Sequence, residues 1–169
     1  MALKKSSEII AIGAAVTESA ANTFTQAQID LQLNPLDQEV FVVLAVNSDL
    51  SSPDVVAGTS TRCQASISTT SRTAVGDLRN SNVLTFAQND IRMGAGSVEG
   101  VPFHRNASET PPSDLPYLAI IATNDFFLQV VGTANTSAKT FSAKVYGYRA
   151  KADAATYAAL TQSELLSAN

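Results

Sequence analysis

The only histidine of this 169-residue chain is His104 and its only cysteine is Cys63, so these two residues are the first candidates for chemistry. His104 precedes Arg105 in an irregular stretch that contains no second histidine and no cysteine. A single histidine without a partner is a poor catalytic or metal site, and we expect His104 to have a loop or packing role. Cys63 has no cysteine to pair with, and we expect it to be a small buried core residue.

The acidic residues are the remaining candidates for catalysis, and most of them occupy turn positions. These are Asp37, Asp49, Asp54, Asp77, Asp114 and Asp125. Aspartate favours turns because its side chain bonds to nearby backbone amides, so we interpret these residues as turn formers. Asp49 and Asp54 are the alternative, as ligands of a loop-bound calcium ion, but they lack EF-hand spacing. The chain also has no phosphate-binding glycine loop, nucleophile elbow or metal-binding histidine pair. We therefore predict no catalytic, cofactor-binding or metal-binding residues and no enzymatic activity.

Composition and charge narrow the class of protein. With 169 residues, of which 45% are hydrophobic, the chain is long enough to bury a full core as a single domain. Only 15% of the residues are charged, which is typical of a polar surface that meets other subunits as well as of a bland soluble domain. The net charge is −4 and the basic residues are scattered, so strong direct nucleic-acid binding is not expected.

The N-terminal stretch imitates a secretory signal, because Lys4 and Lys5 precede the apolar run Ile9–Val16. Glu8 interrupts the approach to this run, and the run is very short. A membrane-spanning helix needs about 20 apolar residues, so no transmembrane segment is predicted. We expect residues 1–22 to form an ordered N-terminal strand or arm.

Two triplets match the N-glycosylation sequon, and they begin at Asn106 and Asn135. Because no secretory signal is predicted, we interpret both matches as chance.

The middle of the chain alternates between strand patterns and polar connections. The segment Thr23–Leu33 places apolar and polar residues on opposite faces, as in a strand with one buried face. After a turn at Asn34–Asp37, the continuous apolar run Glu39–Val46 predicts a strand covered on both faces. We expect a surface loop over Asn47–Ser60, and then a strand over Thr61–Thr69 with Cys63, Ala65 and Ile67 facing the core. Val83–Met93 carries a weaker strand pattern, and Ser97–Leu115, which includes His104, is expected to be a long loop.

The segment Pro116–Lys151 contains three apolar runs separated by two short polar breaks, and it predicts three adjacent antiparallel strands. The last run alternates, with Phe141, Ala143 and Val145 on one face and polar or larger side chains on the other. Asp153 then caps a predicted C-terminal helix over Ala154–Leu166.

Together these patterns predict an all-β fold, a two-sheet antiparallel β-sandwich that is jelly-roll-like. It would have about eight strands, an N-terminal arm and a short C-terminal helix. The expected divisions are an arm over residues 1–22, a sandwich over residues 23–152 and a helix over residues 153–169.

The pattern resembles the single jelly-roll coat proteins of small icosahedral viruses. The resemblance covers roughly Thr23 to Lys151 and rests on the strands Thr23–Leu33, Glu39–Val46 and Thr140–Lys151. It implies a virion structural protein, a capsid subunit that assembles into a homo-oligomer, with other virion proteins as further partners and without a cofactor. The chain departs from many members of this class because it has no basic arm.

Subunit contacts are expected at both ends of the chain. The expected residues are Ile9, Ile10, Ile12, Val16, Tyr157, Leu160, Leu165 and Leu166. Deleting the residues before Ala20 is then expected to abolish assembly and leave a folded monomer. The alternative is a cell-surface or carbohydrate-binding β-sandwich module, which exposed rings of Tyr117, Tyr146 or Tyr148 beside loop acids would favour.

Overall fold

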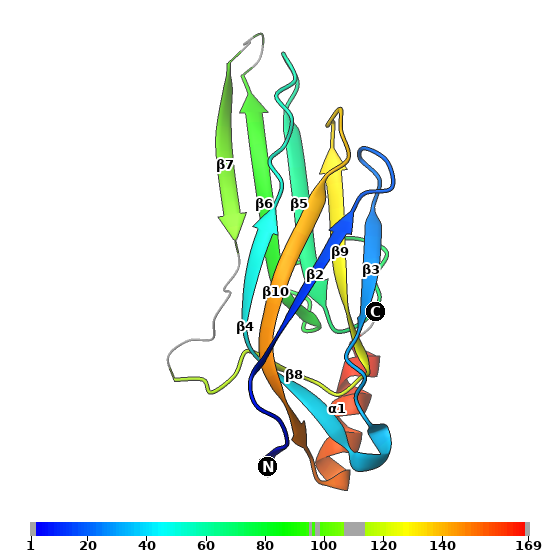
Figure 1. The fold of residues 1–169 in the computed structure, drawn as a ribbon. Coiled ribbons are helices and arrows are strands. Elements are labelled where there is room, and N and C mark those ends of the chain that lie inside the picture. The colour runs from blue at the N-terminus through cyan, green and yellow to red at the C-terminus, as the bar shows by residue number, and fades with distance from the viewer. Residues whose placement is uncertain (1–2, 95, 97–98, 107–113, 168–169) are drawn as a thin grey trace.

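The computed structural model describes residues 3–94, 96, 99–106 and 114–167, and in this part of the chain ten strands form two antiparallel sheets (Figure 1). Sheet A consists of β1 (Lys4–Lys5), β2 (Ile10–Thr17), β4 (Glu39–Leu50), β8 (Ala119–Ile121) and β10 (Thr140–Lys151). Sheet B consists of β3 (Thr25–Asp30), β5 (Thr61–Ser68), β6 (Val83–Met93), β7 (Gly100–Asn106) and β9 (Asp125–Thr133). A 3-10 turn, η1 (Pro35–Asp37), precedes β4, and the helix α1 (Ala154–Leu166) follows β10.

The strand order is that of a jelly roll. Sheet A has the order β1-β10-β4-β8, with β2 also paired to β10, and sheet B has the order β3-β9-β5-β6-β7. The chain changes sheet between β2 and β3, and again on the way to β4 and to β5. It also changes sheet between β8 and β9 and between β9 and β10. The predicted two-sheet sandwich is therefore confirmed, and its edges are β3 and β7 in sheet B.

The prediction of three adjacent strands over residues 116–151 is wrong. The three strands exist, but β4 separates β8 from β10 in sheet A, and β9 lies in sheet B. The connections between them cross from one sheet to the other instead of forming hairpins. Asn124 secures the first crossing, because its carbonyl and side-chain oxygens accept hydrogen bonds from the backbone amides of Leu31 and Leu33.

The core explains why β4 reads as apolar on both faces. Phe41 and Val43 point between the sheets, where they pack with a cluster that includes Phe126 and Phe141. Val40 and Val42 point outward into a second cluster, under α1. The second cluster contains Ala122, Ala150, Ala152, Tyr117, Ile120, Tyr148, Tyr157 and Leu160, among others. A strand needs apolar residues on both faces only where both are covered, so the prediction for Glu39–Val46 is confirmed.

Two predicted loops contain regular strand. β4 continues to Leu50, because its last residues pair with Phe141–Lys144 of β10. His104 does not lie in a loop but in β7, which pairs with Ala87–Met93 of β6. Pro102 masked this strand in the sequence, because proline within a run normally argues against a strand and is tolerated at an edge.

The N-terminal arm is largely a strand of the sandwich. β2 pairs with β10 from Ile10 to Thr17, and Val16 is buried in the core. Deleting the residues before Ala20 would remove an edge strand and part of the core, so we expect this deletion to destabilise the subunit itself.

The C-terminal helix has the predicted bounds, and the Asp153 side chain caps it by accepting a hydrogen bond from the Thr156 amide. Within the described ranges, no helix has the length and apolar character needed to cross a membrane.

Candidate assembly surfaces

The two residues most often used in chemistry are both engaged in the structure. Cys63 is fully buried, and burial raises the pKa of its thiol to about 11, as expected for a structural cysteine. His104 is exposed on β7, and its Nδ1 atom contacts Asn89 Oδ1 on β6. The Asp90 carboxylate lies on the opposite face of sheet B, because Asp90 pairs with Phe103 whereas His104 pairs with Asn89, and it is held there by Arg62 and Arg92. The described residues contain no group of three or more histidine, cysteine or acidic side chains placed to hold a metal ion.

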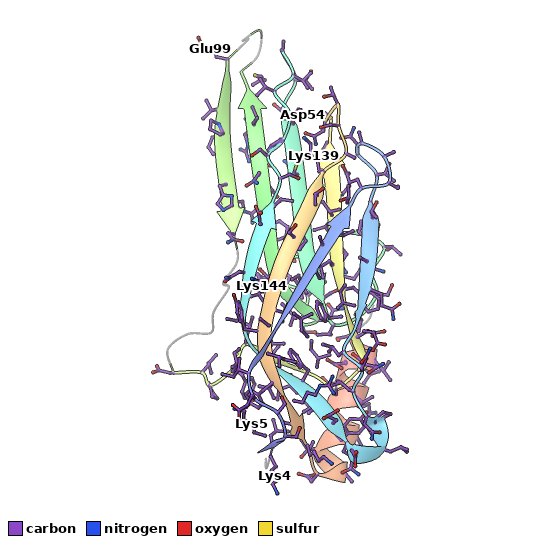
Figure 2. The ribbon with its side chains drawn as sticks, in the orientation of Figure 1. Lys4, Lys5, Asp54, Glu99, Lys139 and Lys144 are labelled. Atoms are coloured by element: carbon purple, nitrogen blue, oxygen red, sulfur yellow. The ribbon has the colours of Figure 1, made fainter. Side chains whose placement is uncertain are left out.

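Three loops meet at one end of the sandwich in a polar cluster, which we call the loop clamp. It consists of Asp54 and Lys139, both labelled in Figure 2, and of Glu18 and Asn135. Glu18, Asn135 and Lys139 are buried, whereas Asp54 is partly exposed. Glu18 is 4% exposed, and its two carboxylate oxygens accept hydrogen bonds from the amides of Gly132, at 2.7 Å, and Lys139, at 2.8 Å. Glycine at position 132 leaves room for the side chains of Glu18 and Asn135, because a Cβ atom there would lie 2.7 Å from Asn135 Nδ2 and 3.3 Å from the Glu18 carboxylate oxygens.

Asp54 is the second carboxylate of the loop clamp that accepts hydrogen bonds. Its carboxylate contacts Lys139 Nζ at 2.5 Å and accepts hydrogen bonds from the backbone amides and hydroxyls of Thr136 and Ser137. The bond with Lys139 is the main reason that the pKa of Asp54 lies well below its usual range. The lysine ammonium thus occupies the position beside Asp54 that a bound cation would take. Asp49 does not lie in the loop with Asp54, because it belongs to β4 opposite Ser142.

Asn135 completes the loop clamp and explains one sequon match. It is 5% exposed, and its side chain donates to the carbonyl of Arg62 and accepts from the amide of Asp54. A buried and fully bonded amide is inaccessible to a glycosylating enzyme. The second sequon begins at Asn106, and its other two residues lie outside the described residues.

The predicted contact residues fall into two groups. Ile9, Leu165 and Leu166 are 58%, 62% and 70% exposed, and Ile10 is 37% exposed, so they are available to a partner. The other four are used within this chain. They are Val16 and Ile12 in the core between the sheets, and Tyr157 and Leu160 in the cluster under α1. Val16 is buried, whereas Ile12, Tyr157 and Leu160 are partly buried, and the contact of these four side chains with other subunits stays a prediction.

The structure reveals an apolar flank on β7, in a stretch whose irregular composition predicts a loop. All seven residues of β7 are exposed, including the large apolar side chains of Val101 and Phe103. β6 is the single described strand that pairs with β7. The spacing of Val101 and Phe103, two positions apart, was the available signal, and Pro102 between them obscured it.

Arginine side chains surround this apolar flank on the outer face of sheet B. The buried carboxylate of Asp90 accepts hydrogen bonds from Arg62 at 3.0 Å and from Arg92 at 3.2 Å. The Arg92 guanidinium also lies over the Phe103 ring, 4.8 Å from its centroid, and Arg105 lies over Phe86 at 5.6 Å. These guanidinium groups are therefore held in place before any partner arrives.

The tyrosines that would favour carbohydrate binding are all partly buried. Tyr117 and Tyr148 pack in the cluster under α1, and Lys5 Nζ lies 5.5 Å from the Tyr148 ring centroid. They do not offer the open aromatic platform on which sugars stack.

Comparison with known proteins adds no family to this description: neither the protein-family models nor the curated proteins that were searched match the chain.

Proposed function

We propose that this chain is a structural virion protein, a capsid subunit that assembles with copies of itself and has no catalytic activity. The observation that carries the proposal is the jelly-roll strand order, an architecture that viral capsid domains share with lectins and cupins. The exposed apolar side chains favour an assembled protein over a monomer. Val101 and Phe103 lie on β7, and Leu165 and Leu166 lie at the end of α1, where an isolated subunit leaves them in water.

The loop clamp supports the same role from a different direction. It joins three loops by charged and backbone hydrogen bonds, so this end of the subunit keeps one shape. Rigid surfaces lose little conformational entropy when they bind a partner, which favours contacts repeated many times in a shell.

The test is the mass of the purified, untagged chain, measured by light scattering over a series of protein concentrations. We expect discrete capsomer-sized or shell-sized species, with the virion as the location of the protein. A stable monomer near 17.7 kDa at high concentration would contradict the proposal.

A further inference from the structure

The outer face of sheet B beside β7 carries an excess of positive charge in an otherwise acidic protein. We call it the arginine face. Its members are Arg62, Arg92, Arg105, Val101, Phe103 and Asp90, together with the Arg79–Asp77 ion pair, which lines a depression with Phe86 and Arg105. Cys63, Ala65 and Ile67 point inward, so Arg62, which alternates with them on β5, points outward. Val101, Phe103 and Arg105 lie opposite Arg92, Asp90 and Gln88 in the β6–β7 register, which places them on the same face.

The net charge of the arginine face differs in sign from that of the rest of the chain, and this difference indicates the kind of surface that it would bind. When Glu99, which directly precedes β7, is counted with the two aspartates, four arginines against three acidic residues give this side of the sheet a net charge of +1. The whole chain has 11 basic and 15 acidic residues, so the remainder has 7 basic and 12 acidic residues, a net charge of −5. Two arginine faces would repel each other, whereas an arginine face and another surface of a second copy attract. When a contact between two different surfaces repeats from copy to copy it is heterologous and produces rings or larger assemblies, whereas two copies that exchange it reciprocally form a pair.

The opposite edge of sheet B offers the complementary charge. β3 forms that edge, at the right of Figure 1 where β7 is at the left. Asp30 of β3 lies directly opposite Asp125 of β9, on the outer face, because their neighbours Ile29 and Phe126 point into the core. Two like charges in a cross-strand pair are unfavourable unless a cation joins them. Their described hydrogen-bond donors are neutral groups: the Gln28 and Asn124 side chains and the Gln32 amide.

We propose that the arginine face of one copy binds the acidic β3 edge of a second copy, in a repeated heterologous contact. This inference rests on the proposed function. Phe103 and Val101 supply the apolar centre, and Arg105, which forms no ion pair with a described carboxylate, supplies charge that reaches Asp30 and Asp125 of the neighbour. Arginine and aromatic residues dominate the binding energy of protein interfaces, and here Asp90 has already fixed two of the arginines.

The test compares assembly of the full chain and four variants by light scattering. Arg105→Glu should raise the protein concentration needed for half-assembly at least about tenfold, and Asp30→Lys should act in the same direction. The double variant Arg105→Glu/Asp30→Lys restores opposite charges across the contact and should recover most of the loss. Lys144→Glu is the matched control, because Lys144 is exposed on sheet A, and it should assemble like the unmodified chain.

The outcomes separate this inference from the proposed function. If the unmodified chain assembles and Arg105→Glu assembles equally well, the contact is refuted while self-assembly stands. Failure of the double variant to recover, with both single variants impaired and all three folded by circular dichroism, also overturns it. If Arg105→Glu loses binding to a nucleic acid but not assembly, the arginine face belongs to that partner instead. A chain that never assembles contradicts the proposed function itself.

Discussion

Glu18 is the residue whose replacement most directly tests the physical account of the loop clamp. Its buried carboxylate accepts one hydrogen bond from the Gly132 amide and one from the Lys139 amide. Glu18→Gln keeps the size of the side chain but replaces one acceptor oxygen by an NH2 donor. One of the two amides then faces a donor and has no acceptor. A hydrogen bond to a charged group contributes about 1.5–3 kcal/mol, and a buried polar group left without a partner costs about 1–3 kcal/mol.

We therefore expect Glu18→Gln to lower the free energy of unfolding by about 2–4 kcal/mol, measured by urea denaturation at one fixed protein concentration. The matched control is Glu8→Gln, because the Glu8 side chain is 96% exposed and makes one surface ion pair, with Lys5 at 3.4 Å. Such pairs contribute between about 0 and 1 kcal/mol. If the two variants were equally stable, the reasoning about the loop clamp would be refuted.

Three further predictions concern other parts of the sandwich. Gly147→Ala should lower the free energy of unfolding in urea by about 1–3 kcal/mol, because a Cβ atom there would clash with the Val42 carbonyl oxygen and lie 2.6 Å from the Phe41 ring. Gly13→Ala is the control and should be nearly neutral, because open space surrounds Gly13. Burial raises the pKa of Glu164 above 4.5, so the protonated form favours folding and the stability should fall as the pH rises through the folded pKa. The unfolding midpoint of Glu164→Gln should lack this pH dependence, and midpoints of the variant and the unmodified chain that change in parallel with pH would contradict the prediction. Cys63 should react with a thiol reagent only as fast as the protein opens, and rapid labelling of the native protein would contradict its burial.

The Glu164 prediction follows from how α1 is held. Glu164 Oε2 accepts hydrogen bonds from the amides of Ala122 and Thr123, while its buried Oε1 atom has no hydrogen-bond partner among the residues that the structure describes. Asp125 of β9 is the charged group that further raises the Glu164 pKa, after desolvation. Protonation removes the cost of burying a charge next to another carboxylate, which is why lower pH should tighten this contact.

Local patterns predicted most of the strands and the helix, because burial of one face gives the sequence of a strand or helix a characteristic period. The sequence alone was enough to predict the alternation in β10, the apolar residues on both faces of β4 and the helix capped by Asp153. Sheet membership was not readable, because the pairing of β10 with β4 and β2 joins segments far apart in the chain. A break between two apolar runs does not tell whether the chain turns within a sheet or crosses to the other one.

The candidate site was harder to predict than the fold, for the same reason. Asp54 and Lys139 are 85 positions apart, and Glu18 contacts an amide 114 positions away, so only the folded chain brings the loop clamp together. The exposed β7 flank was hidden by Pro102 and by the irregular composition around it. Of the residues expected at subunit contacts, Ile9, Leu165 and Leu166 are exposed, whereas Val16 is buried in the core.

The central claim is that this jelly roll is a subunit that builds closed assemblies with copies of itself. Electron microscopy of the untagged protein, prepared alone and at the concentration used for light scattering, tests it most directly. The account predicts closed shells or discrete rings whose repeating unit has the dimensions of this sandwich. A field of separate particles of monomer size, unchanged as the protein concentration rises, would contradict it.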